Sequence, residues 1–135
     1  MDNWTLSQWP VIEKIVRPLF HPAIEDVTVE GILHALSDPV RVHIYAEIAK
    51  ADCPQICSSF LEVSDRVVPK STLSEHFKIL REAGLIRSER RGVQLRNTSR
   101  CDENRARFGT LITAVIDAHR AQGERARRTR RKKPA

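Results

Sequence analysis

One continuous stretch decides the fold: Pro69-Lys-Ser-Thr-Leu-Ser-Glu-His-Phe-Lys-Ile-Leu-Arg-Glu-Ala-Gly-Leu-Ile-Arg-Ser-Glu-Arg-Arg-Gly-Val-Gln-Leu-Arg96. Leu73, Phe77 and Leu80 recur at i, i+4 and i+7, which places them on one face of a helix. The opposite face collects polar side chains, namely Ser71, Ser74, Lys78 and Glu82. The stretch therefore predicts an amphipathic helix that buries one face and offers the other to a polar partner.

The end of this helix and the segment that follows it are also marked in the sequence. Gly84 supplies the left-handed conformation that helix C-termini often need. Two short runs follow, 85–89 and 93–97, around the glycine-containing connection Arg90-Arg91-Gly92, which has hairpin length. A helix followed by a hairpin with a basic tip indicates a winged helix.

Together with Ala35-Leu-Ser-Asp-Pro-Val-Arg-Val-His-Ile44 upstream, this stretch resembles the ArsR family of bacterial winged helix-turn-helix repressors. The family typically carries an Ala-Leu-x-Asp-Pro-x-Arg opening, a Ser-Thr-hydrophobic-Ser helix running into Leu-Arg-x-Ala-Gly-Leu, and a charged wing. The resemblance covers residues 26–100. It implies a mainly α fold of about five to six helices plus a two-stranded wing, with a recognition helix beginning near Lys70 and a wing tip at Arg90-Arg91.

Three helices are expected before the recognition helix. The first carries an apolar stripe behind a cap at Asp26 or Thr28, and the second starts at Ser37-Asp38-Pro39 and runs to about residue 51. The third, over residues 54–63, is the expected positioning helix of the helix-turn-helix. Near the start of the second helix, Arg41 suits either a DNA phosphate or a surface ion pair, and the sequence leaves both open.

Both ends of the chain lie outside the resemblance. Residues 1–25 carry many apolar side chains and predict a short helix between Pro10 and Pro18 that either covers the core or dimer or binds a partner. Residues 101–122 predict a C-terminal dimerisation helix. Its apolar stripe consists of Phe108, Leu111, Ile112, Val115 and Ile116. Residues 123–135 predict a disordered basic tail able to add non-specific affinity for DNA.

Composition supports one globular domain with a nucleic-acid partner. The 135 residues suit a single modest core. The net charge of +6 is unevenly spread, because residues 1–65 hold 4 basic and 10 acidic side chains whereas residues 66–100 hold 9 and 3. Positive charge thus concentrates where a polyanion would bind. No apolar run reaches the roughly 18 residues of a membrane helix, and no signal peptide is evident, so a cytoplasmic protein is expected.

The polar helix face and the wing supply the candidate DNA-binding residues. They are Arg41, Lys70, Ser71, Thr72, Ser74, Glu75, Lys78, Arg90 and Arg91. Hydroxyl, amino and carboxylate groups at a helix start can read base edges in the major groove, and arginine suits phosphate or a narrow minor groove. Thr72-x-x-Glu75 also spells a capping box, which would engage both side chains with backbone amides.

Nothing in the sequence indicates catalysis, since phosphate-binding loops and the common nucleophile and zinc-protease motifs are missing. Cys53-x-x-x-Cys57 is a candidate redox sensor, although small buried thiols are the commoner role. No metal or other cofactor is expected. We therefore expect a dimeric, sequence-specific double-stranded DNA-binding regulator, a repressor, reading a palindromic operator under control of thiol redox state or a small effector. The alternative is a winged helix that binds protein or RNA.

Overall fold

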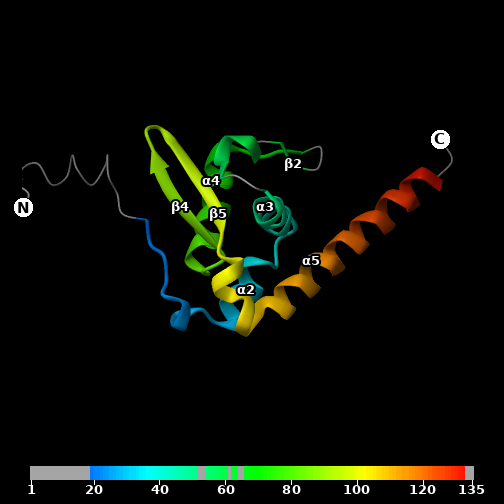
Figure 1. The fold of residues 1–135 in the computed structure, drawn as a ribbon. Coiled ribbons are helices and arrows are strands. Elements are labelled where there is room, and N and C mark those ends of the chain that lie inside the picture. Colours follow the sequence, from blue (N-terminus) through cyan, green and yellow to red (C-terminus); the bar gives the residue numbers. More distant parts are fainter. Residues whose placement is uncertain (1–18, 52–53, 61, 64–65, 133–135) are drawn as a thin grey trace, which may run out of the picture.

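The computed structural model describes residues 19–51, 54–60, 62–63 and 66–132. Four α-helices and a three-stranded antiparallel sheet make up most of this part of the chain. The long last helix runs along one side and projects beyond the body (Figure 1). The fold is thus mainly helical, as predicted, but the described residues hold four α-helices in place of five to six. The predicted helix between Pro10 and Pro18 lies outside the described residues.

Helices α2 (Val29–Ala35) and α3 (Pro39–Lys50) begin at the predicted caps. The Thr28 hydroxyl accepts from the backbone amide of Gly31, and the Asp38 carboxylate accepts from the amides of Val40 and Arg41. Pro39 at the first helical position costs no hydrogen bond, because that amide has no partner inside the helix. A short 3-10 helix, η2 (Ile24–Asp26), precedes α2.

The predicted third helix over residues 54–63 is not formed. The chain instead makes strand β1 (Gln55–Ile56), a 3-10 turn η3 (Cys57–Phe60) and strand β2 (Glu62–Val63). Strand β1 pairs with the wing, and β2 pairs with β3 (Arg66–Val67). These backbone pairings outweigh a helical spacing that the sequence supports over barely two turns. The wing sheet therefore has three strands, in the order β1-β5-β4, where two were predicted.

Helix α4 (Lys70–Glu82) and the hairpin of β4 (Ile86–Arg91) and β5 (Gln94–Ser99) occupy the predicted region. Gly84, at φ 86°, ends the helix, and the amide of Leu85 reaches back to the Leu80 carbonyl. A Cβ atom at Gly84 would overlap the Val27 side chain. Arg91 pairs with Gln94, so the hairpin loop is only two residues long, with Gly92 first.

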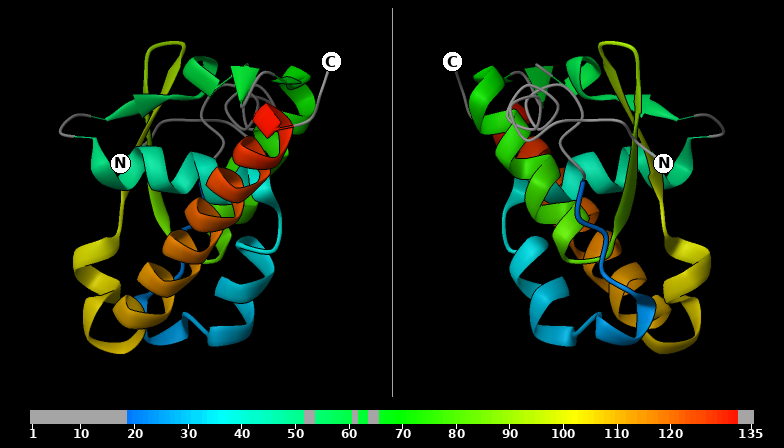
Figure 2. Two further views of the ribbon diagram at one scale, coloured as in Figure 1. Left: turned by 90° about the vertical axis from the view of Figure 1, so that its right-hand side faces the viewer. Right: turned by 90° about the vertical axis from the view of Figure 1, so that its left-hand side faces the viewer.

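Helix α5 spans Cys101–Lys132, ten residues beyond the predicted end at residue 122. The prediction of a disordered tail from residue 123 is thus corrected as far as residue 132. Arginine, alanine and lysine dominate this part, and all three have high helix propensity, so one glycine does not stop the helix. The end of α5 projects from the body in the view of Figure 1, whereas the views of Figure 2 show it in front of or behind the rest of the molecule.

The core lies where α2, α3, α4, the base of the sheet and the first half of α5 meet. Its least exposed large side chains include Ile32, Ile44, Tyr45, Phe77, Leu80, Leu85 and Ile86. The Phe60 ring meets the Phe77 ring edge-on at 5.6 Å between centroids. This contact lets the single turn of η3 hold α4 in place, which is the task expected of the missing positioning helix.

Candidate nucleic-acid interface

Helix α4 separates its side chains as the sequence predicted. Leu73, Phe77 and Leu80 are at most 2% exposed. Every candidate reader on this helix is exposed, namely Lys70, Ser71, Thr72, Ser74, Glu75 and Lys78. The helix starts at Lys70 behind Pro69, without a side-chain cap. Thr72 and Glu75 therefore lie inside the helix, the capping-box alternative does not apply, and both side chains are free of that role.

The exposed face of α4 and the wing border one groove of about 640 Å³. Ser74, Glu75 and Lys78 line it from the helix, and Arg90 lines it from β4. Arg90 shares a strand face with the buried Ile86 and Ser88, because alternate residues of a strand point the same way. The wing arginine and the helix readers thus open onto the same space.

Arg91 lies on the opposite face of β4 from Arg90. Its guanidinium pairs with the Glu89 carboxylate at 2.8 Å, and both side chains are about 60% exposed. An exposed pair of this kind contributes about 0–1 kcal/mol, so a phosphate can displace the carboxylate at little cost. The two wing arginines are therefore placed differently, with Arg90 facing the groove and Arg91 facing away from it.

Arg41 is not on the interface. It is 7% exposed, and its Nε and Nη2 donate to the carbonyls of Ala35 and His34 at 2.7 and 3.2 Å. Its Nη1 lies 3.3 Å from Nδ1 of His76 on α4. Because guanidinium has no acceptor, that ring nitrogen must accept. Arg41 thus satisfies the last carbonyls of α2 and supports the recognition helix from behind. Its Nη1 also lies 3.9 Å from the Asp38 carboxylate, so the structure agrees with the ion-pair alternative and not with the phosphate contact.

A buried polar bridge that was not predicted from the sequence joins α4 to the wing. Arg81 Nε donates to the Ser88 hydroxyl at 2.9 Å, and that hydroxyl donates to Oδ1 of Asn97 at 2.6 Å. Asn97 Nδ2 in turn donates to the carbonyls of Gln55 and Leu95 at 3.0 and 3.2 Å. Arg81, Ser88 and Asn97 are each at most 7% exposed. The bridge links α4 with all three strands of the sheet.

The segment that precedes α2 is bonded to the wing and to α5. His21 Nε2 accepts from the Ser88 backbone amide at 2.9 Å, on the outer edge of β4. Partial burial, followed by the charge of Arg87, lowers the pKa of His21, which favours the neutral ring that this bond requires. Leu19 and Phe20 then line the groove beside α4. The groove therefore has a third wall, formed by the N-terminal segment.

Arg100 anchors the same segment at the base of the sheet. It is 4% exposed and donates to the Pro22 carbonyl at 2.8 Å and to the Glu103 carboxylate at 2.7 Å. The hydrogen bonding of Arg100 to the Glu103 carboxylate is the main reason that the pKa of Glu103 is lowered. A buried cation thus has both a carbonyl and a carboxylate partner.

The predicted dimer stripe is only partly available to a second copy. Phe108 and Ile112 are each 6% exposed and belong to the protein's own core. Leu111, Val115 and Ile116 are half-buried against it. Less apolar surface is free than the sequence predicted, because α5 packs on α3 and places Phe108 and Ile112 in the core of the same chain.

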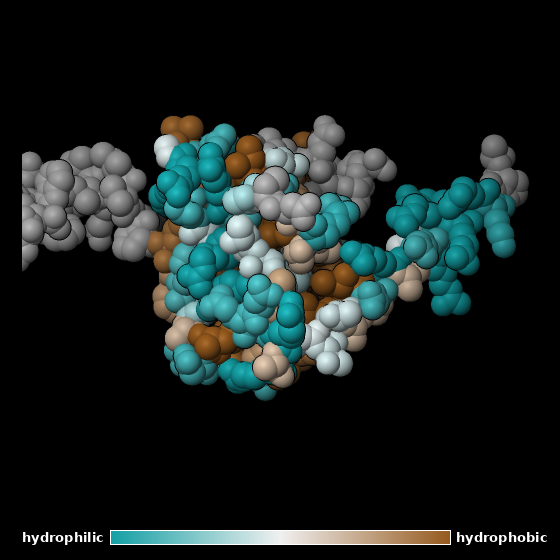
Figure 3. All heavy atoms as spheres, in the orientation of Figure 1, coloured by the Kyte–Doolittle hydropathy of each residue, from teal (hydrophilic) through white to brown (hydrophobic). Residues whose placement is uncertain are grey.

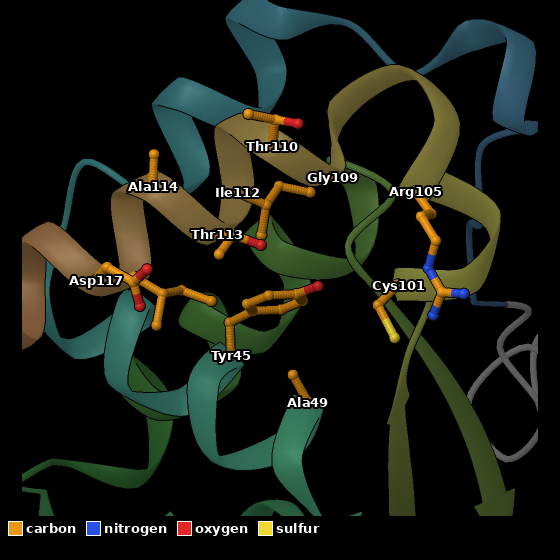
Figure 4. Close-up of a pocket in the computed structure, with 11 residues that line it drawn as sticks. Tyr45, Ala49, Cys101, Arg105, Gly109, Thr110, Ile112, Thr113, Ala114 and Asp117 are labelled. Atoms are coloured by element: carbon orange, nitrogen blue, oxygen red, sulfur yellow. The ribbon is translucent and has the colours of Figure 1, made fainter.

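A second hollow, of about 650 Å³, lies between α3 and α5 (Figure 4). Tyr45, Ala49, Ile112 and Ile116 give it an apolar floor, and Arg105 and Asp117 stand at its rim. Burial raises the pKa of Tyr45 to about 12, so its hydroxyl stays protonated. In the space-filling view, hydrophobic side chains come to the surface beside α5 at this place (Figure 3).

Only one cysteine of the candidate redox sensor lies among the described residues. Cys53 is not among the described residues, and Cys57 opens η3. Cys101 is exposed, with a free thiol. Among the described residues, no three His, Cys, Asp or Glu side chains gather as a metal site would require. No helix in the described ranges is both long and apolar enough to cross a bilayer, α5 being long but highly charged.

Part of this region matches a known domain family. Residues 36–89 match the helix-turn-helix domain family. An ArsR-like transcriptional regulator from Rhodococcus sp. RHA1 is 26% identical in sequence over 72% of this chain and 90% of its own, with a TM-score of 0.48. Among curated proteins, no sequence is significantly similar.

With the β4-β5 hairpin as a wing beside it, the matched segment defines a winged helix-turn-helix domain.

Proposed function

We propose that the chain acts as a dimeric repressor that binds a palindromic operator sequence-specifically. One observation carries the proposal: the exposed polar face of α4 and Arg90 of the wing open onto one groove. In B-form DNA the major groove admits a helix and displays a distinct pattern for each base pair. Ser71, Thr72, Ser74 and Glu75 would read base edges, and Lys70 and Lys78 would bind a guanine edge or phosphate.

Selection from a random duplex pool followed by affinity measurement tests this proposal. We expect a palindrome whose half-sites lie about one helical turn apart or a multiple of it. Ser74→Ala combined with Lys78→Ala should abolish discrimination between the selected and a scrambled duplex. Arg105→Gln, an exposed change on the first turns of α5, serves as the control and should leave it intact. Selection that enriches nothing, or a double variant that discriminates as before, would refute the operator reading.

The proposed dimer rests on the half-buried outer stripe of α5, formed by Leu111, Val115 and Ile116. Ile116 also lines the apolar hollow against α3, so a second copy packed there would cover both. We expect sedimentation to show a dimer, and Ile116→Asp to give a folded monomer that retains its helical circular dichroism. A monomeric wild-type protein would contradict this part of the proposal.

Thiol control is the proposed regulation. Cys57 opens η3, whose Phe60 packs on the recognition helix, so a change at this turn would be transmitted to α4. Mild oxidation should alter operator affinity in the wild type and leave Cys57→Ser unchanged. Equal responses of the two proteins would refute a role for this cysteine.

A further inference from the structure

The C-terminal end of α5 is a basic rod without an apolar face. Residues 118–132 hold seven arginine or lysine side chains and a single acidic one, Glu124. All eight of these charged side chains are exposed, and mostly hydrophilic atoms cover the face of this end of the helix that is seen in Figure 3. A helix that is polar all round has no stripe for a core, a second helix or a bilayer. Its chemistry therefore points to an anionic partner.

The charges of this rod are not used within the protein. Within the described ranges, every ion pair lies elsewhere, and none involves a residue beyond 105. The negative end of the helix dipole favours cations in the last turn, which accounts for Arg130, Arg131 and Lys132. The dipole does not account for Arg120, Arg125, Arg127 and Arg128, which lie further from the terminus.

The position of the rod relates it to the α4-wing interface. In Figure 1 and both views of Figure 2, the C-terminal end of α5 lies at the same end of the molecule as the wing tip and the start of α4. Helix α2 and the first turns of α5 lie at the opposite end. In Figure 1 the rod points to the side away from the wing, so a duplex bound by α4 and the wing would meet the rod where it extends across the end with the wing tip.

We propose that the segment 120–132 of α5 is a second contact site for the phosphate backbone of the DNA that α4 and the wing bind. This inference rests on the proposed function and extends it from one reading helix to a wider electrostatic footprint. Each arginine that neutralises a phosphate releases a condensed counterion, so the site should strengthen binding to any sequence and make it more dependent on salt.

The salt dependence of binding to a long duplex of arbitrary sequence tests the site. Arg128→Gln with Arg131→Gln removes two charges one turn apart while keeping side-chain length. The slope of log K against log salt should become shallower by about 2. Arg87→Gln with Arg105→Gln removes the same net charge at the opposite end and should leave the slope unchanged. Circular dichroism should show that both variants are folded.

Each outcome of this experiment decides something. Equal slopes for the rod variant and the wild type, or an equal loss in the control variant, would overturn the inference, the second by showing that only net charge matters. Weaker binding to single-stranded RNA with unchanged duplex binding would also overturn it. If the wild-type protein fails to bind any duplex, the proposed function fails. If the wild type binds duplex and the rod variant has the same salt slope, only the inference about the rod fails.

Discussion

Replacing Asn97 with alanine should separate the two roles of the buried bridge, stability and wing placement. The hydrogen bonds of this amide to described residues include one from Ser88 and two to main-chain carbonyls. At a net value of about 1 kcal/mol each, their loss should lower the free energy of unfolding by about 3 kcal/mol. The Ser88 hydroxyl would also lose its acceptor, and the wing would no longer be fixed to Arg81.

Asn104→Ala is the matched control. Asn104 is also 0% exposed and donates to two carbonyls, those of Gly84 and Arg100. Among the described residues its Oδ1 has no hydrogen-bond partner, and it is not bonded to the bridge. Its replacement should cost about 2 kcal/mol. Urea unfolding followed by circular dichroism measures the free energy of unfolding of both variants. Asn97→Ala should lower it more than Asn104→Ala does.

DNA binding then reports on wing placement. Arg90→Ala should reduce the salt slope by about 1 in the wild type, and by the same amount in the Asn104→Ala background. In the Asn97→Ala background, the loss should be clearly smaller, because a displaced wing no longer presents the arginine to the duplex. Equal effects of Arg90→Ala in all three backgrounds would refute the reasoning, even if the stability difference were as expected.

Three further predictions concern stability. Gly84→Ala should cost about 3 kcal/mol in urea unfolding, from left-handed strain and overlap with the neighbouring valine, whereas Gly92→Ala, at φ 62° with open space around it, should cost about 1 kcal/mol. Burial and nearby arginines lower the His21 pKa, so its contribution is complete above the unfolded value of 6.5 and is lost as pH falls through the lowered one. His21→Gln should flatten that part of the stability profile, and an unchanged slope would count against it. The Glu103 pKa is lowered chiefly by hydrogen bonds from Arg100, so stability should drop as pH falls below about 4.5, and Glu103→Gln should lose this drop while being less stable at neutral pH.

The sequence was most informative where one strong local signal acted alone. Asp38 before Pro39, the apolar spacing of α4 and the stop at Gly84 each predicted an element that the structure contains. Those signals depend on neighbours within a turn or two of the chain. They suffice to place the exposed readers of α4 on one face, and the family match over residues 36–89 agrees.

Elements that depend on distant partners were predicted poorly. The third helix was wrong because strand β1 takes its hydrogen bonds from β5, some forty residues further along the chain. Arg41 was misplaced because its partners are the carbonyls of an earlier helix and a ring on a later one. One signal for the buried bridge was present: Ser88 is a polar residue two positions after Ile86, on the inward face of a strand. Such a break in the alternation indicates a buried hydrogen-bonding partner.

The bridge between α4 and the sheet has a mechanical consequence. Since Arg81, Ser88 and Asn97 are closed off from water, freeing the hairpin alone would strand polar atoms in the interior at a cost of several kcal/mol. Helix α4 and the β4-β5 hairpin must then move together as one rigid unit. If the proposed dimer binds an operator, a signal that releases it would change the distance or tilt between the two α4-wing units, because bending one unit internally would cost more.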